Sequence, residues 1–431
     1  METLEALKAG GLRGSKELRL SGGLDTFPRE ILDLADTLEI LDLSGNHFST
    51  LPDEFCRLEK LRIAFFSQNR FEEFPSVLGK CPSLEMVGFK SCRIRTIGED
   101  ALPSRIRWLI LTDNQLEALP DSIGQRPRLQ KLMLAGNRLR SLPRSLAGCR
   151  NLELLRLSAN RLEEFPEWLT ELGKLSWLAW SGNPFCEGSR SENLPSIPFH
   201  DLSIEEVLGQ GASGIISRAT WKRPGGVRPV AAKIFKGHVT SDGYPEDEMA
   251  ACIAAGEHAN LVRLEGRLDG HPEGRHGLVL GLIPARYRNL GLPPSYETCT
   301  RDVFSDGTTL EVEQIVSIAK GVASLTEHLH RRGVNHGDLY AHNILVDDRN
   351  HPLMGDFGAA SLMEAFVPAR RERLQRLEVR AFGCLLDDLL GLVDPSIVMT
   401  NSVCSLRDLR DACLVEAVDR RPLFEEVVRR L

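Results

Sequence analysis

The sequence predicts an α/β solenoid built from short repeats, followed by a separate α+β domain. A leucine pattern recurs at nearly constant spacing as far as residue 186, and a polar break with two prolines covers residues 187–200. From residue 201 onward, strand-like runs and a long amphipathic run replace the repeats. The total of 431 residues is also more than one hydrophobic core usually serves.

The repeats follow one pattern, seen first in full as Leu38-x-x-Leu41-x-Leu43-x-x-Asn46. Its last position recurs at Asn69, Cys92, Asn114, Asn137, Asn160 and Asn183. The spacing is 23 residues except for one step of 22, and a degenerate copy ending at Gly23 makes eight copies. The pattern resembles the leucine-rich repeat over residues 12–186. Such units stack into a horseshoe, and the resemblance implies that each asparagine, or Cys92 in its place, bonds backbone groups.

The residues between the leucines should face the concave, solvent side, because strand side chains alternate in direction. Most of these residues are apolar, and an exposed apolar ridge usually marks a contact surface. The predicted partner-binding residues are Ile63, Phe65, Met86, Trp108, Ile110, Met133, Leu154 and Trp177. Three alternatives are open: the ridge binds a separate protein, the repeats dock on the second domain of the same chain, or the ridge does neither.

Charge and cysteine usage narrow the class of protein. With 53 basic and 60 acidic residues the net charge is −7, which gives no reason to expect nucleic acid or an anionic membrane as partner. The start of the chain lacks the pattern of a secretory signal, and no apolar stretch approaches the roughly 20 residues of a membrane span. Ten scattered cysteines without a C-x-x-C pair indicate reduced thiols, so we expect a cytoplasmic protein.

A glycine-rich stretch opens the second domain, residues 201–431. It lies between strand-like runs and consists of Gly209, Gln210, Gly211, Ala212, Ser213 and Gly214. Glycines there would let backbone amides approach phosphate, although an ordinary hairpin turn has similar spacing. A strand-like run at 230–235 then carries one lysine, Lys233, among apolar residues. Its ammonium group is costly in such a place unless it meets a negative charge.

Two acids and an amide stand at fixed offsets further on: Asp338, Asn343 five residues later, and Asp356 thirteen beyond that. Between them, the apolar runs 344–346 and 352–354 flank a polar turn, so the segment reads as loop, hairpin and loop. The hairpin would bring the three side chains together. Two oxygen ligands for magnesium and a separate carboxylate that accepts a hydroxyl proton suit phosphoryl transfer.

The segments His336-Gly-Asp338-Leu-x-x-x-Asn343 and Asp356-Phe-Gly358 resemble the catalytic loop and metal-binding motif of protein kinases. The resemblance implies a bilobal α+β domain that binds ATP and Mg²⁺. It implies that Lys233 contacts the α- and β-phosphates and pairs with a helix glutamate, for which Glu248 is preferred over Glu246. It also implies that Asp338 accepts the hydroxyl proton while Asn343 and Asp356 hold magnesium.

Further cofactor-binding residues follow from the same resemblance. The glycine-rich stretch would cover the phosphates, and Ile216, Ala231, the gatekeeper Leu280 and the hinge residue Leu282 would contact the nucleotide. His336 reads as an architectural brace. Residues 310–331 predict the amphipathic helix that precedes the catalytic loop.

The resemblance weakens after Gly358. Only 22 residues separate Asp356 from Glu378, where a motif that opens a helix in kinases recurs with Glu for Asp, so the activation segment is short. The A-P-E motif is missing, which leaves Arg421 without its usual glutamate, and Glu372 is one candidate substitute. Gly337 replaces the arginine that contacts a phosphorylated activation segment.

Arginines 373, 376 and 380 share one helical face that is either solvated or able to contact an acidic substrate.

The sequence therefore predicts an ATP-dependent protein kinase, serine/threonine rather than tyrosine. Its repeats would recruit a partner or substrate, or regulate the kinase. Two alternatives remain open, an ATP-binding pseudokinase scaffold and a kinase-fold enzyme that phosphorylates a small molecule.

Overall fold

The computed structural model describes residues 3–186, 195–211, 213–223, 225–237, 239–240, 242–394 and 400–431. The contacts between residues divide the chain into two compact units, Met1–Leu172 and Gly173–Leu431. The eighth repeat motif, which ends at Asn183, therefore belongs to the second unit. The helices of the described residues are all too short or too polar to cross a bilayer.

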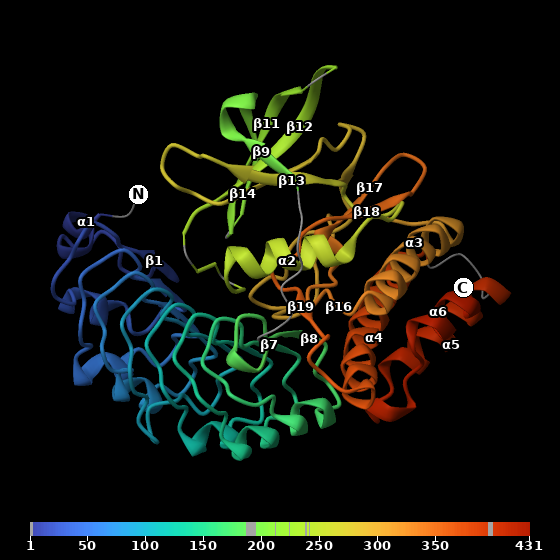
Figure 1. Cartoon of the computed structure of the whole chain (residues 1–431). Coiled ribbons are helices and arrows are strands. Elements are labelled where there is room, and N and C mark those ends of the chain that lie inside the picture. Colours follow the sequence, from blue (N-terminus) through green and yellow to red (C-terminus); the bar gives the residue numbers. More distant parts are fainter. Residues whose placement is uncertain are drawn as a thin grey trace. The chain divides into compact units, whose positions relative to one another are not determined.

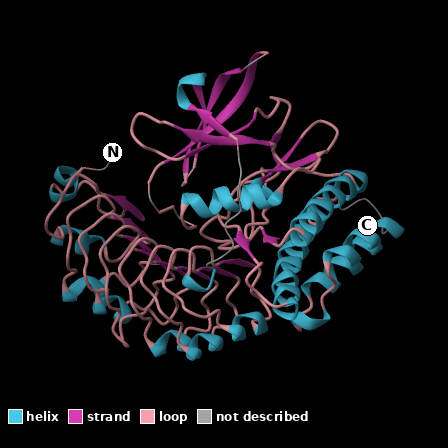
Figure 2. Cartoon of the chain, in the orientation of Figure 1, coloured by secondary structure: helices cyan, strands magenta, loops and turns pink. Residues whose placement is uncertain are grey.

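The first unit is a curved array of repeats (Figure 1). A short helix, α1 (Leu4–Lys8), precedes seven strands that pair in parallel, each with the next. These strands are β1 (Glu17–Arg19), β2 (Ile40–Asp42), β3 (Ile63–Phe65), β4 (Met86–Gly88), β5 (Trp108–Ile110), β6 (Lys131–Met133) and β7 (Leu154–Arg156). The strands follow the inner curve of the array and short helical turns follow its outer curve (Figure 2).

A repeated apolar pattern explains this arrangement. The central residue of every strand, such as Leu41 or Leu109, is fully buried between neighbouring repeats. On the outer side, a proline stands immediately before the short helix in most repeats, and its fixed φ suits the entry to a helical turn. Helical turns of this kind are the 3-10 helices Arg29–Leu34, Asp53–Arg57, Ser76–Lys80, Asp121–Gln125, Arg144–Gly148 and Glu167–Glu171.

The asparagines bond backbone groups of two successive repeats, as the repeat pattern implies. Asn137 Nδ2 donates to Leu111 O at 2.8 Å and to Leu134 O at 2.9 Å, and its Oδ1 accepts from Leu116 N at 3.0 Å. Cys92 occupies the same slot, and its Sγ lies 3.3 Å from Phe66 O. The side chain at this position therefore has a structural role.

The second unit begins with a six-stranded sheet in the order β10-β11-β12-β14-β13-β9. Its strands are β9 (Ser196–Pro198), β10 (Leu202–Gln210), β11 (Gly214–Arg223), β12 (Gly226–Phe235), β13 (Leu264–Asp269) and β14 (Gly277–Gly281). Neighbours are antiparallel except for β9, which lies parallel to β13 although it comes from the stretch 187–200, predicted as linker. The helix α2 (Pro245–Ala255) lies beside this sheet (Figure 1).

The rest of the second unit is mainly helical. It contains α3 (Val312–Arg331), α4 (Pro368–Leu390), α5 (Asn401–Leu414) and α6 (Phe424–Arg430). Short strands complete it: β8 (Trp177–Ala179), β15 (Arg288–Asn289), β16 (Val334–Asn335), β17 (Ile344–Val346), β18 (Pro352–Met354) and β19 (Ser361–Leu362). The predicted hairpin is present, because β17 and β18 pair antiparallel. The two units thus have the architecture that the sequence predicts, a solenoid and a bilobal domain.

One expectation about the helical part is wrong. The motif at Glu378 was expected to open a helix, but α4 begins ten residues earlier, at Pro368. The segment after Asp356 is so short that it runs directly into α4, and proline is well suited to the first position of a helix. Glu378 consequently lies inside the helix and is buried.

Replacing Asn137 with alanine should destabilise the repeat unit. It removes three buried hydrogen bonds and leaves two carbonyls and one amide without this partner. We expect a loss of roughly 2–4 kcal/mol in the free energy of unfolding, measured by urea denaturation followed by circular dichroism. Arg140→Ala, a matched change at an exposed position of the same repeat, should stay within about 0.5 kcal/mol. A loss below about 1 kcal/mol for Asn137→Ala would contradict the structural role.

Candidate active site

Lys233, on β12, meets two carboxylates that come from different elements. Its Nζ donates to Glu248 Oε1 on α2, and it lies 3.7 Å from Asp356 Oδ1 in the loop after β18. Both Lys233 and Glu248 are almost fully buried. Of the two candidate glutamates, Glu248 is therefore the one that reaches Lys233, whereas Glu246 Oε1 lies 3.2 Å from His276 Nε2.

The two carboxylates compete for one ammonium group. Burial disfavours a charged Lys233, but Asp356 and Glu248 outweigh this effect and raise its pKa. Burial raises the pKa of Glu248 to about 7, although the charge of Lys233 acts to lower it. The charge of Asp356 also raises this pKa. Packing around Asp356 opposes its ionisation, although its side chain is still 55% exposed, and Lys233 and the Gly358 amide hold its pKa below the ordinary value. Asp356 is thus the carboxylate that stays charged most readily.

The catalytic loop brings the other predicted residues together. Asn343 Nδ2 donates to Asp338 Oδ2 at 2.8 Å and to Asp338 O at 3.1 Å. Asp338 N donates to His336 Nδ1, and the buried His336 ring packs against Phe357, so His336 braces the loop. Because Asn343 uses its nitrogen on Asp338, its amide oxygen is left as a possible metal ligand. That oxygen and the Asp356 carboxylate are hard donors that suit Mg²⁺, which takes few protein ligands and completes its shell with phosphate and water.

The glycine-rich stretch forms the turn between β10 and β11. Gly209 and Gln210 end β10, Gly214 begins β11, and Gly211 N donates to Gly214 O at 3.0 Å. A Cβ at Gly209 or Gly211 would meet no atom within 4 Å, whereas one at Gly214 would lie 2.6 Å from Ile234 O. Packing therefore demands glycine only at Gly214, and the first two glycines leave open space where a phosphate could approach.

Of the remaining predicted cofactor residues, some are fixed by the sheet register. Ile216 pairs with Lys233, and Ala231 pairs with the predicted gatekeeper Leu280. Leu282 directly follows β14 and is partly exposed. Ala212 lies outside the described residues, and Ser213 precedes β11.

The predicted partner-binding residues lie on six successive strands. Ile63 and Phe65 are on β3, Met86 on β4, Trp108 and Ile110 on β5, Met133 on β6, Leu154 on β7 and Trp177 on β8. Trp177 differs from the others because it belongs to the second unit and packs within it. Its ring stacks on Tyr340 with centroids 4.3 Å apart, and its Nε1 donates to Leu339 O at 3.0 Å. Ile63, Met86 and Leu154 are buried, so the expected exposure is wrong at these three positions. For all seven residues, partner binding stays a prediction.

Glu378 has a role at the site that the sequence analysis did not assign. Its Oε1 accepts from Gly337 N at 2.6 Å, and its Oε2 accepts from His336 N at 3.2 Å and lies 2.7 Å from His330 Nε2. Burial opposes ionisation, but the hydrogen bond and charge of His330 outweigh it and lower the pKa of Glu378. A charged carboxylate inside α4 therefore holds the backbone next to Asp338. The recurrence of the kinase motif with Glu for Asp was the only signal for it.

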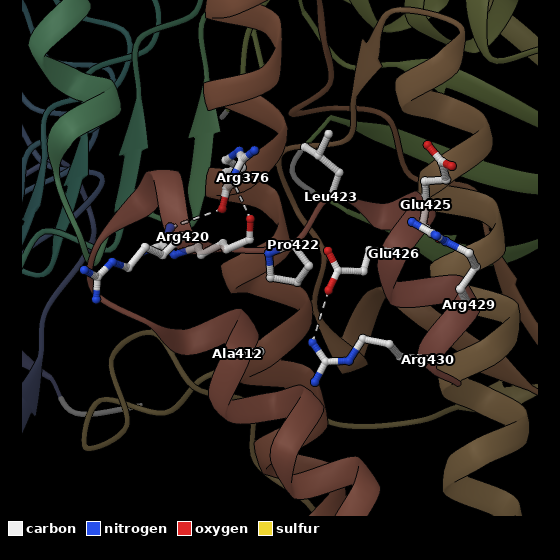
Figure 3. A pocket seen from close by; sticks show the side chains of 10 residues that line it. Arg376, Ala412, Arg420, Pro422, Leu423, Glu425, Glu426, Arg429 and Arg430 are labelled. Carbon is white, nitrogen blue, oxygen red and sulfur yellow. Dashed lines mark hydrogen bonds and ion pairs between the residues drawn. The ribbon is translucent and has the colours of Figure 1, made fainter.

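The arginines of α4 differ in their surroundings: Arg373 is exposed, as expected for a solvated face, whereas Arg376 and Arg380 are partly buried. Arg376 lines part of a pocket of about 330 Å³ in the helical part, shown with its lining side chains in Figure 3. Arg376 donates to the carbonyls of Asp419 and Arg421 at 2.6 and 2.7 Å and pairs with Glu372. Glu372 therefore does not substitute as the partner of Arg421. None of the predicted catalytic residues lines this pocket, so it is not the candidate active site.

Comparisons with known proteins agree with this geometry. Residues 202–380 match the family model for protein tyrosine and serine/threonine kinases, and residues 37–58, 104–162 and 127–185 match leucine-rich repeat models. The chain therefore combines leucine-rich repeats with a protein kinase domain.

Individual relatives cover only part of the chain. The chain is 25% identical over 201 residues to the angiopoietin-1 receptor of Danio rerio, which is 44% of this chain and 17% of that receptor. It is 32% identical over 168 residues to the rust resistance kinase Lr10 of Triticum aestivum (37% of this chain, 24% of that kinase). It is 32% identical over 170 residues to the ephrin type-A receptor 8 of Rattus norvegicus (38% and 41%). The chain thus spans well under half of the length of each of these relatives.

Replacing Glu378 with glutamine should destabilise the second unit in a pH-dependent way. The change keeps the shape but removes a charge that accepts three hydrogen bonds, so we expect a loss of about 2–3 kcal/mol in the free energy of unfolding at pH 7. The native pKa lies below the ordinary 4.5, so the charge stabilises the fold fully above 4.5 and progressively less as the pH falls through the native value. In denaturation series from pH 7 to pH 4, the difference in free energy of unfolding between the wild type and Glu378→Gln should shrink only at the acid end. Glu372→Gln in the same helix is the control. A difference between the wild type and Glu378→Gln that is already small at pH 7 would contradict the role of the charge.

Proposed function

We propose that this chain is an ATP-dependent protein kinase whose leucine-rich repeats recruit a partner or substrate, or regulate the kinase. The proposal rests on one group of side chains from both lobes. Lys233 is in ionic contact with Glu248 and Asp356. In the catalytic loop, Asn343 is hydrogen-bonded to Asp338. A buried ammonium is costly unless it serves a ligand or an ion pair, and here Lys233 pairs with the buried Glu248 and with Asp356.

Each residue has a distinct task in this proposal. Lys233, oriented by Glu248, neutralises the α- and β-phosphates of ATP, and the amides of the turn at Gly209 to Gly214 cover the phosphates. Asp356 and the amide oxygen of Asn343 would hold Mg²⁺, which neutralises the charge that builds up on the phosphates when it is bound. Asp338, held by Asn343 and His336, orients the acceptor hydroxyl and takes its proton.

The short activation segment supports two other candidate functions. Only nine residues separate Gly358 from α4, and they include β19, so a peptide would have little of the usual platform on which to lie. A kinase-fold enzyme for a small molecule, or a pseudokinase scaffold that binds ATP without transferring phosphate, fits that feature. The serine/threonine acceptor, the protein partner on the repeats and the cytoplasmic location stay predictions.

Asp338→Ala tests phosphate transfer directly. With labelled ATP and magnesium, the wild-type chain should label itself or casein, and Asp338→Ala should lower the rate at least roughly 100-fold because the proton acceptor is lost. Affinity for ATP should stay within about threefold, since Asp338 is not assigned to nucleotide binding. Mass spectrometry of the labelled site would identify serine, threonine or tyrosine. ATP binding without any transfer that depends on Asp338 would favour the scaffold.

A matched pair of variants tests the ion pair. Glu248→Gln should lower kcat/KM for ATP by roughly 30- to 100-fold, about 2–3 kcal/mol, because Lys233 loses its orienting charge. Glu246→Gln, two residues away in the same helix, should leave kcat/KM within about twofold because Glu246 is exposed and faces His276. Equal effects of the two changes would argue against the assigned pair.

A further inference from the structure

The segment between Gly358 and α4 is only nine residues long. After Gly358 the chain forms β19, which pairs with β16, and reaches α4 at Pro368. In a kinase of ordinary length, this segment packs on the loop and receives the phosphate that an arginine reads. Here Gly337 stands at that arginine's place with φ of 72°, and a Cβ would lie 2.5 Å from Ala359 O and 2.9 Å from Leu178 O. The space is filled by backbone, partly from the last repeat.

The last repeat, Gly173–Cys186, packs against the catalytic loop within the second unit. Trp177 is 1% exposed; its Nε1 bonds Leu339 O, next to Asp338, and its ring lies nearly parallel to Tyr340 at 8°. Asn335 Nδ2 donates to Leu178 O at 3.3 Å, and Trp180 N donates to Ser361 Oγ at 2.9 Å. The strand β8 thus lies beside β16 and β19 (Figure 1).

The same repeat reaches the helix that carries Glu248. Gly182 has φ of 70°, and a Cβ there would lie 2.5 Å from Asp247 Oδ2 and 2.7 Å from the ring of Tyr244. Tyr244 is the N-cap of α2, and Asp247 is in its first turn. One repeat therefore touches both the catalytic loop and the helix whose glutamate orients Lys233.

Two arginines anchor the other end of the repeat. Arg380 Nη1 donates to Ser176 Oγ at 2.7 Å, and Arg421 Nη2 donates to Gly173 O. Arg421 is 1% exposed, and its remaining hydrogen bonds go to the carbonyls of Val415, Arg376 and Glu416. The guanidinium that would bind a glutamate of a longer activation segment is thus committed to backbone carbonyls, one of which belongs to the last repeat.

We propose that the last repeat replaces the activation segment as the support of the catalytic loop, with Trp177 as a positioning residue for Asp338. The inference rests on the proposed kinase activity. It implies that the catalytic unit includes this repeat and that its activity needs no phosphate on the activation segment. Trp177 acts through Leu339 O and Tyr340 and does not itself touch the reacting groups.

Trp177→Ala and Trp177→Phe test the proposal on the full chain. We expect Trp177→Ala to lower kcat for labelling of casein by roughly 10- to 100-fold, because a small displacement of Asp338 is costly, while KM for ATP stays within about twofold. Trp177→Phe should fall in between, since it keeps a ring against Tyr340 but loses the indole N–H. Trp168→Ala, a buried tryptophan of the preceding repeat, is the control for loss of packing and should leave kcat within about threefold. Wild-type protein freed of phosphate by a phosphatase should keep its rate.

Hydrogen exchange separates this inference from the activity itself. Amides of residues 335–343 should exchange at least about tenfold faster in Trp177→Ala than in the wild type or in Trp168→Ala, whether or not the protein transfers phosphate. Absence of activity in the wild type together with this change would overturn the proposed function and keep the support role. Unchanged exchange, a higher kcat in Trp177→Ala, or loss of activity after phosphatase treatment would overturn the inference. If Trp177→Ala does not fold, Trp177→Phe decides by the same exchange measurement.

Discussion

One buried ammonium shared by two carboxylates joins the halves of the catalytic domain. Lys233 comes from the sheet, Glu248 from α2 and Asp356 from the loop after the hairpin, and three separate stretches of chain must be placed correctly for the charges to meet. A buried charge that loses its partner costs about 3–5 kcal/mol, so this contact penalises any misplacement of α2 or of the hairpin. The sheet register places Lys233, and the β17–β18 pairing places the loop that carries Asp356, so both hold the geometry of this contact.

The catalytic loop is held in place by groups that take no part in the proposed reaction. Glu378 accepts the amides of His336 and Gly337 from one side, and the last repeat holds the carbonyls and rings on another. Gly337 fits between them because a side chain there would collide with two backbone oxygens. The division of the chain at Leu172, ahead of the last repeat rather than after it, follows from these contacts.

Periodicity and local motifs explain what the sequence predicts well. The 23-residue step places every strand of the array, and the turn at 347–350 places the hairpin that unites Asn343 with the loop before Asp356. The sequence pattern does not predict interactions between segments that are distant in the chain. Arg421 bonds Gly173, 248 residues away, and β9 pairs with β13 from a stretch with no strand pattern. Glu372 was an attractive substitute for the missing glutamate, but its helical spacing of four residues favours Arg376 instead.

The division at Leu172 has a consequence for how such a chain can evolve. The final copy of the 23-residue unit falls within the second unit, and in the described part of the first unit the strands pair in a parallel ladder, each with the next. Stacked arrays tolerate the gain or loss of whole units because their stability is a sum of local contacts. Duplication or deletion ahead of Leu172 would therefore change the length of the repeat array, whereas changes in the terminal copy are restricted by its contacts with the catalytic loop.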